Sequence, residues 1–129
     1  MYTVFIAGAG GIGSAIGILL REIYSVKVDI YIGDINTKAT EKAKEWILKA
    51  GTSVGDIHCV DMSGDWKETL PSIDIVLDCL PGRFAPEMAR FAMENNSHYV
   101  NLTEYVAETK EIIEMVQSAE TGFGLQSGL

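Results

Sequence analysis

The first twenty residues, Met1 to Leu20, constrain this chain most, because they carry no charged side chain and are crowded with glycine. Their length alone would allow a membrane-spanning helix, and Gly13 and Gly17 have the GxxxG spacing of packed membrane helices. The glycines interrupt the apolar run, however, and no lysine or arginine precedes it, as a signal peptide would require. A buried strand, a glycine-rich turn and a helix explain the same residues better. We therefore expect no membrane partner.

The segment reads as the start of a nucleotide-binding unit. Thr3 to Ala7 is a β-branched and aromatic run typical of a buried parallel strand. Residues 8–13 (GAGGIG) fit the pattern G-x-G-x-x-G. Residues 12–22 have helical spacing that places a set of apolar side chains on one face, namely Ile12, Ile16, Leu19, Leu20 and Ile23. A second predicted strand, Lys27 to Gly33, is followed at once by Asp34. This order of elements is typical of dinucleotide-binding proteins.

Each position of the glycine motif has a predicted role. Gly8 allows a tight turn off the strand, Gly10 lets the backbone approach a pyrophosphate, and Gly13 lets the helix pack closely on the sheet. The N–H groups of Gly11 and Ile12, at the positive end of the helix dipole, suit an anionic phosphate. We therefore predict that these five residues bind a dinucleotide.

Asp34 is predicted to select the cofactor. Its carboxylate would accept hydrogen bonds from the ribose hydroxyls of adenosine and would repel a 2′-phosphate. NAD is therefore the expected cofactor, with NADP as an alternative because Lys38 lies four residues further on. An ordinary acidic turn residue at a strand end is the other interpretation of Asp34.

The rest of the chain continues the alternation of strands and helices. We expect strands at 57–60, 73–80 and 98–102, and helical segments at 36–50, 66–70, 85–94 and 106–119. This order predicts an α/β fold, a Rossmann-type doubly wound parallel sheet of about five to six strands with helices on both faces. Residues 1–120 are expected to form the dinucleotide-binding domain, and residues 121–129 to begin the connection to a second domain that is missing here.

Ligands of such a sheet bind beyond the carboxyl ends of its strands. Asp61 and Met62 are predicted to meet the adenine, with a helix N-cap as the alternative for Asp61. Leu80 and Pro81 are predicted to line the passage towards the nicotinamide, unless they form a plain turn. Asn101 is expected to reach the nicotinamide or a substrate.

Composition and the remaining polar residues exclude several functions. With 18 acidic and 10 basic residues the net charge is −8, which disfavours a nucleic-acid partner. Two isolated cysteines, Cys59 and Cys79, suit a reducing cytoplasm. Cys79 has no basic neighbour in the sequence and is interpreted as a buried apolar residue, while His58 and His98 are interpreted as structural. No metal site is predicted, and the catalytic residues stay unknown.

Four segments carry a family resemblance: residues 4–20 (VFIAGAGGIGSAIGILL), 59–70 (CVDMSGDWKETL), 74–105 (DIVLDCLPGRFAPEMARFAMENNSHYVNLTEY) and 122–129 (GFGLQSGL). With them the chain resembles the N-terminal NAD(P)-binding domain of saccharopine dehydrogenase-like reductases, although that family usually has Asp in place of Asn101. The resemblance implies an NAD(P)-dependent oxidoreductase that acts by hydride transfer on C–N bonds of amino acids or amines. It also implies a second domain, absent from this chain, that binds the substrate.

A second function remains open. Nucleotide-sensing regulatory domains, which bind NAD or ATP without catalysis, have a similar length, glycine motif and acid. The segment from Leu80 to Tyr105 fits the reductases better. A homodimer is also allowed by the sequence.

Overall fold

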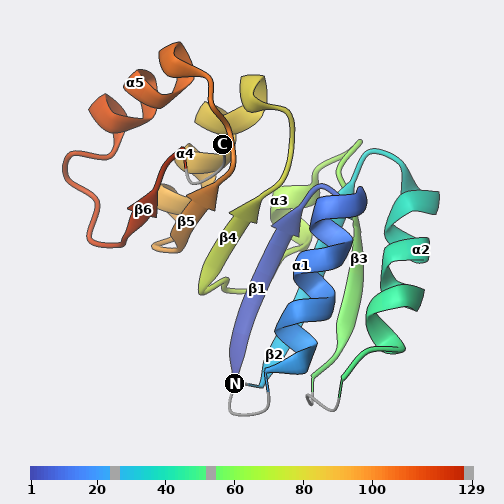
Figure 1. Cartoon of the computed structure of the whole chain (residues 1–129). Coiled ribbons are helices and arrows are strands. Elements are labelled where there is room, and N and C mark those ends of the chain that lie inside the picture. Colours follow the sequence, from blue (N-terminus) through green and yellow to red (C-terminus); the bar gives the residue numbers. More distant parts are fainter. Residues whose placement is uncertain (24–26, 52–54, 127–129) are drawn as a thin grey trace.

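A computed structural model describes residues 1–23, 27–51 and 55–126, which form one parallel sheet (Figure 1). The strand order is β3-β2-β1-β4-β5-β6, and every pair of neighbours is parallel. The predicted doubly wound sheet is confirmed. Its order reverses between β1 and β4, which are neighbours although two strands separate them in sequence. The strands are β1 (Tyr2–Ala7), β2 (Val28–Asp34), β3 (Ile57–Asp61), β4 (Ile75–Asp78), β5 (His98–Asn101) and β6 (Phe123–Gly124).

Helices cover the two faces of the sheet unequally (Figure 1). One face carries α1 (Gly11–Glu22) and α2 (Thr37–Leu48), which pack on β1, β2 and β3. The other face carries an aromatic core in which Phe5 contacts Trp66 and Phe91. The elements on that face are α3 (Trp66–Thr69), the 3₁₀ turn η1 (Gly82–Phe84), α4 (Ala85–Glu94) and α5 (Val106–Met115).

Some element bounds differ from the sequence prediction. The last helix ends at Met115 instead of residue 119, and β4 covers four residues of the predicted 73–80. Phe123 and Gly124 pair with Tyr99 and Val100 as a sixth strand, within the segment predicted to leave the domain. No helix in the described part of the chain has the length and apolar character needed to cross a membrane.

Helix α1 packs on the sheet through small residues. Gly13, Ser14 and Gly17 are its buried positions. A Cβ on Gly13 would overlap the carbonyl oxygen of Gly8, and a Cβ on Gly17 would overlap the side chain of Ile47 in α2. The helix therefore lies too close to its neighbours for larger side chains. Most of the apolar face identified from the sequence is consequently exposed, by 61% at Ile12, 64% at Leu19 and 42% at Ile23.

A buried polar network joins the carboxyl ends of β4 and β5. The hydroxyl of Tyr99 donates to Asp78 Oδ2 at 2.6 Å, and Asn101 Nδ2 donates to the Tyr99 hydroxyl at 3.2 Å. The N–H of Leu80 donates to Asp78 Oδ1 at 3.0 Å. All three network side chains are at most 3% exposed. Burial raises the pKa of Asp78, although the hydrogen bonds from Tyr99 and Leu80 act in the opposite direction.

Gly13→Ala should lower the free energy of unfolding by about 2 kcal/mol or more, because the new methyl group must displace backbone. Gly11→Ala adds the same methyl group two positions away, where no described heavy atom lies within 4 Å. That control should change stability by less than about 0.5 kcal/mol. Urea unfolding followed by circular dichroism measures the free energy of unfolding of both variants and of the native chain. Equal stability of the two variants would contradict the close approach of α1.

Asp78 should make stability depend on pH. Because its folded-state pKa exceeds that of the unfolded chain, its contribution is fully present below about pH 4. That contribution is lost as the pH rises through the folded-state value. Asp78→Asn cannot ionise, so its unfolding free energy relative to the native protein should increase between about pH 4 and pH 7. Asp65→Asn, at an exposed carboxylate that makes no capping hydrogen bond, is the control. A pH-independent difference for Asp78→Asn would refute the assignment.

Candidate dinucleotide-binding site

The glycine turn lies at the point where the strand order reverses. Gly8 follows β1 with a φ of +104°, a conformation that favours glycine. Its N–H donates to the carbonyl of Gly33 in β2 at 2.7 Å. On the other side, a Cβ at Gly8 would lie 2.9 Å from the carbonyl oxygen of Cys79, just after β4. The turn is therefore confined between the two halves of the sheet.

The turn leads directly into the N-terminus of α1. Gly10 is the N-cap residue, and among the described residues no side chain accepts a hydrogen bond from the first turn of the helix. Gly10 and Gly11 are exposed, and a Cβ on either would meet no described atom within 4 Å. Uncapped N–H groups beside open space suit an anionic group. The contact of these residues with the pyrophosphate of a dinucleotide stays a prediction from the sequence.

Asp34 connects the end of β2 to this turn. Its Oδ2 accepts from the N–H of Ala9 at 3.0 Å, and its Oδ1 accepts from the N–H of Asn36 at 3.0 Å. Asn36 in turn caps α2, because its Oδ1 accepts from the N–H groups of Lys38 and Ala39. Asp34 is half-buried, and each carboxylate oxygen has a second lone pair. Asp34 is therefore placed to accept hydrogen bonds from a ligand seated on the turn.

Asp61 and Met62 occupy the neighbouring strand end. Asp61 Oδ1 accepts from both the N–H and the hydroxyl of Ser63, and the bond from the hydroxyl contributes most to lowering the pKa of Asp61. Asp65, not Asp61, is the N-cap of α3, so the N-cap alternative for Asp61 is wrong. Met62 lies over Gly33, where an added Cβ would be 2.8 Å from its sulfur. Its side chain borders a cavity of about 130 Å³ that Leu80 and Phe84 also line.

A second hollow, of about 250 Å³, lies between the ends of β1, β4 and β5. Leu80, predicted for this region, lines it together with Ile12 from the glycine motif. Pro81 is exposed at the start of η1. Gly82, which the sequence places with Leu80 and Pro81 along this passage, lines the hollow too, and the sequence prediction missed the half-exposed Tyr105, which packs against Gly82. The full lining is Ile12, Cys79, Leu80, Gly82, Leu102, Thr103, Glu104 and Tyr105.

Asn101 is not among the described residues that line this hollow. The side chain is 1% exposed, and its Oδ1 accepts from the N–H of Gln126 at 3.0 Å while its Nδ2 donates to Tyr99. In this structure the residue therefore holds β5 to the segment after β6.

Cys79, His58 and His98, which the sequence analysis also considered, have structural roles. Burial, with a smaller effect of the Asp78 charge, raises the pKa of the Cys79 thiol to about 11. That thiol is therefore protonated at neutral pH and is no nucleophile. His58 stacks on Tyr31 with 4.4 Å between ring centroids, and His98 Nδ1 accepts from the N–H of Gly122. Within residues 1–23, 27–51 and 55–126, no cluster of three or more potential metal ligands occurs.

Solved structures of dehydrogenases share this fold. Saccharopine dehydrogenase (L-Glu forming) from Saccharomyces cerevisiae matches with a TM-score of 0.77 at 14% identity, over 100% of this chain and 28% of that one. Apo scyllo-inositol dehydrogenase from Lactobacillus casei matches with 0.73 at 12% identity, over 97% and 36%. Levoglucosan dehydrogenase in complex with NADH and levoglucosan matches with 0.70 at 17% identity, over 96% and 34%. The chain thus spans at most 36% of the length of these three proteins.

Sequence comparison is more specific than the shared fold. Among curated proteins, none matches the chain. A family model, described as the saccharopine dehydrogenase NADP-binding domain, matches residues 4–123 and so covers the glycine turn, Asp34 and both strand ends described above. The resemblance inferred from the sequence is confirmed, and the chain belongs to the saccharopine dehydrogenase NADP-binding domain family.

Proposed function

We propose that this chain binds NAD(H) as the cofactor module of an oxidoreductase acting on C–N bonds of amino acids or amines. The observation that carries the proposal is the uncapped N-terminus of α1 beside the open space over Gly10 and Gly11. An acidic protein can bind an anionic cofactor there, because the local field is set by backbone N–H groups and not by net charge.

In this proposal each part of the cofactor contacts a different group of residues. The pyrophosphate would lie on the backbone of Gly10, Gly11 and Ile12, and the adenosine ribose on Asp34. Adenine would lie near Asp61 and Met62, at the end of β3. The nicotinamide end would extend towards the hollow beside Leu80, with Pro81 near it and buried Asn101 holding the end of β5 in place. When bound, the nicotinamide supplies the hydride chemistry, and the chain positions it.

Substrate binding is assigned to a second domain. The hollow beside Leu80 has Glu104 as the one charged residue in its described lining, so it offers no cation to hold the carboxylate of an amino acid. Hydride transfer requires the substrate carbon to be held about 3–3.5 Å from the nicotinamide with water excluded. We therefore place the substrate groups outside residues 1–120, in a domain reached through residues 121–129. A cytoplasmic location belongs to the same proposal, because exposed Cys59 is a free thiol.

The preference for NAD over NADP follows from Asp34. The N–H groups of Ala9 and Asn36 fix its carboxylate beside the turn, where a 2′-phosphate would meet a negative charge. Lys38 could offset this repulsion, although its side chain is exposed to solvent. The family description names NADP, so the preference of this chain requires its own measurement.

Gly10→Val should reduce NADH affinity at least tenfold, a loss of about 1.4 kcal/mol or more, because the new side chain fills the phosphate space. The backbone of Gly10, with φ −75° and ψ −163°, is accessible to valine, so the fold should persist. Ala15→Val, at an exposed position of α1, is the control and should bind normally. Calorimetric titration measures the NADH affinity of the native chain, of Gly10→Val and of Ala15→Val. If Gly10→Val bound NADH as tightly as the native chain does, the proposal would be wrong. If the native chain bound ATP as tightly as NADH, a nucleotide-sensing domain would be favoured.

The native chain should bind NADH more tightly than NADPH by about 10- to 100-fold, the effect expected from a buried polar group left repelled or unpaired. Asp34→Ser combined with Ile35→Arg should reverse this order, since Ile35 is 74% exposed and adjoins the ribose site. Ile35→Arg alone separates the added cation from the lost carboxylate. Fluorescence titrations with both reduced cofactors provide the comparison. Equal affinities in the native chain would show that Asp34 does not select the cofactor.

A further inference from the structure

The segment that follows β4 shapes the hollow beside Leu80. Cys79, Leu80 and Gly82 all line this hollow, which has a volume of about 250 Å³, and Pro81 between them is the N-cap residue of η1. The position of residues 79–82 therefore decides how much room the hollow offers to a ligand.

One side chain holds the backbone of this segment. The N–H of Cys79 donates to the carbonyl of Ala7 in β1 at 2.8 Å, and the strand pairing with β1 ends there. The N–H of Leu80 donates instead to Asp78 Oδ1 at 3.0 Å. Pro81, the next residue, has no N–H to offer. The Asp78 carboxylate therefore fixes the backbone just beyond the point where the sheet no longer does.

The carboxylate of Asp78 is itself fixed from the core. Its Oδ2 accepts from the hydroxyl of Tyr99 in β5 at 2.6 Å, and that hydroxyl accepts from Asn101 Nδ2 at 3.2 Å. Asp78 is 3% exposed and Tyr99 is fully buried. Side chains packed at the density of a protein interior do not move freely. The position of the Leu80 N–H is thus set by a buried chain of hydrogen bonds that starts in β5.

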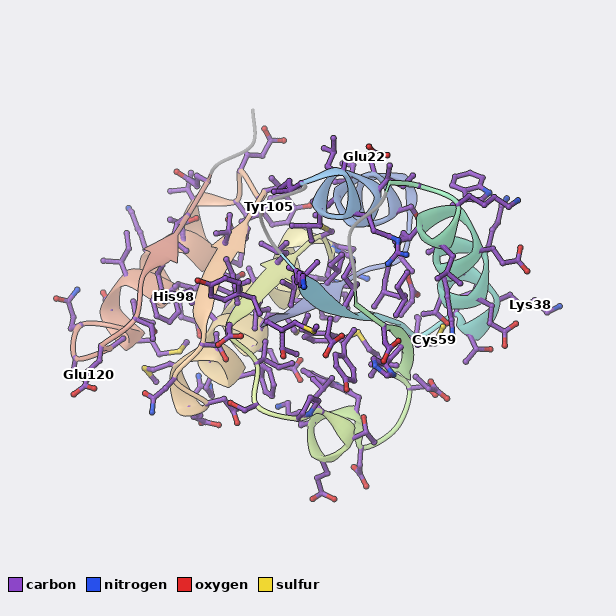
Figure 2. All side chains as sticks on the ribbon, turned by 90° about the horizontal axis from the view of Figure 1, so that it is seen from below. Glu22, Lys38, Cys59, His98, Tyr105 and Glu120 are labelled. Carbon is purple, nitrogen blue, oxygen red and sulfur yellow. The ribbon has the colours of Figure 1, made fainter. Side chains whose placement is uncertain are left out.

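We propose that Asp78 is a positioning residue for the nicotinamide end of the cofactor. The inference rests on the proposed function, in which the nicotinamide lies beside Leu80 and the adenosine ribose lies at the end of β2. Figure 2 shows the separation of the two ends: Tyr105, which lines the hollow, and Lys38, which follows the ribose site, lie on opposite sides of α1, marked by Glu22. Asp78 acts on one of these ends through the backbone of Leu80.

The adenosine end is held by other contacts. Asp34 is tied to the glycine turn through the N–H of Ala9. Leu80 also borders the cavity beside Met62, but the N–H of Met62 donates to the carbonyl of Asp34 at 3.0 Å. None of these hydrogen bonds involves Asp78. A displacement of Leu80 should therefore change the contacts of the nicotinamide and leave those of the adenosine in place.

Asp78→Ala tests the proposal, because it removes the acceptor of the Leu80 N–H. NADH is compared with ADP-ribose, which is the same nucleotide without its nicotinamide. The affinity for NADH should fall at least about fivefold, the order expected when one hydrogen bond is lost. The affinity for ADP-ribose should change less than about twofold, because its contacts lie elsewhere. Calorimetric titration with each ligand gives the ratio of the two affinities.

Asp78→Asn is the conservative variant and should restore most of the NADH affinity. Its side-chain oxygen can still accept from the Leu80 N–H, and its amide can donate to the Tyr99 hydroxyl, which has two lone pairs. Tyr99→Phe keeps the ring in the core but removes the donor that fixes Oδ2. It should shift the affinity ratio in the same direction as Asp78→Ala, by about twofold or more, and it decides the question if Asp78→Ala does not fold.

Ser97→Ala is the matched control for stability. The fully buried Ser97 hydroxyl donates to the carbonyl of Ile73 at 2.7 Å and joins the segments that precede β4 and β5, at the opposite ends of the same strands. Its loss should lower the free energy of unfolding and leave the ratio of NADH to ADP-ribose affinity unchanged. A merely structural role of Asp78 would make the two residues behave alike.

The outcomes separate this inference from the proposed function. If the native chain binds both ligands but the affinity ratio is unchanged in folded Asp78→Ala, or in Tyr99→Phe, the positioning role is wrong and the proposed function remains. The positioning role is also wrong if Asp78→Asn binds NADH as weakly as Asp78→Ala, or if Ser97→Ala shifts the ratio equally. A native chain that binds neither NADH nor ADP-ribose would refute the proposed function, and this inference with it.

Discussion

The close contact between Gly13 of α1 and the carbonyl of Gly8 is the constraint on which this half of the molecule depends. Because Gly13 has no Cβ, the helix begins directly above the end of β1. Gly17 then brings α2 against α1 through Ile47, and the turn comes within hydrogen-bond distance of Asp34. The arrangement that suits a phosphate is thus a consequence of how tightly one helix packs on the sheet.

In the second half of the sheet, β4 and β5 are held together by hydrogen bonds between buried polar side chains. Asp78, Tyr99 and Asn101 place a carboxylate, a phenol and an amide in the core, where each has a partner. Buried polar groups are tolerated when they are hydrogen-bonded, and they then specify one arrangement. Here they fix the end of β4 against β5 and the segment after β6, and Asp78 also holds the backbone of Leu80, which lines the hollow.

Much of this could be predicted from the sequence, because the glycine motif, the apolar strands and the acid after β2 are local signals. Three features were not predicted. A strand of two residues, Phe123 and Gly124, is too short for a periodic pattern. Position at a strand end did not reveal that Asn101 points with Tyr99 into the core, although the alternation of side chains along β5 could have indicated it. The apolar face of α1 was identified correctly, but which face packs inward was decided by glycine contacts that only the assembled structure contains.

The hydrogen bonds around the glycine turn also have a thermodynamic consequence. Gly8 is tied to Gly33, and Ala9 to Asp34, by hydrogen bonds within the protein. A loop that is ordered before binding loses little conformational entropy when the ligand arrives. Because these internal hydrogen bonds hold the turn, we expect association there to resemble the docking of a rigid body.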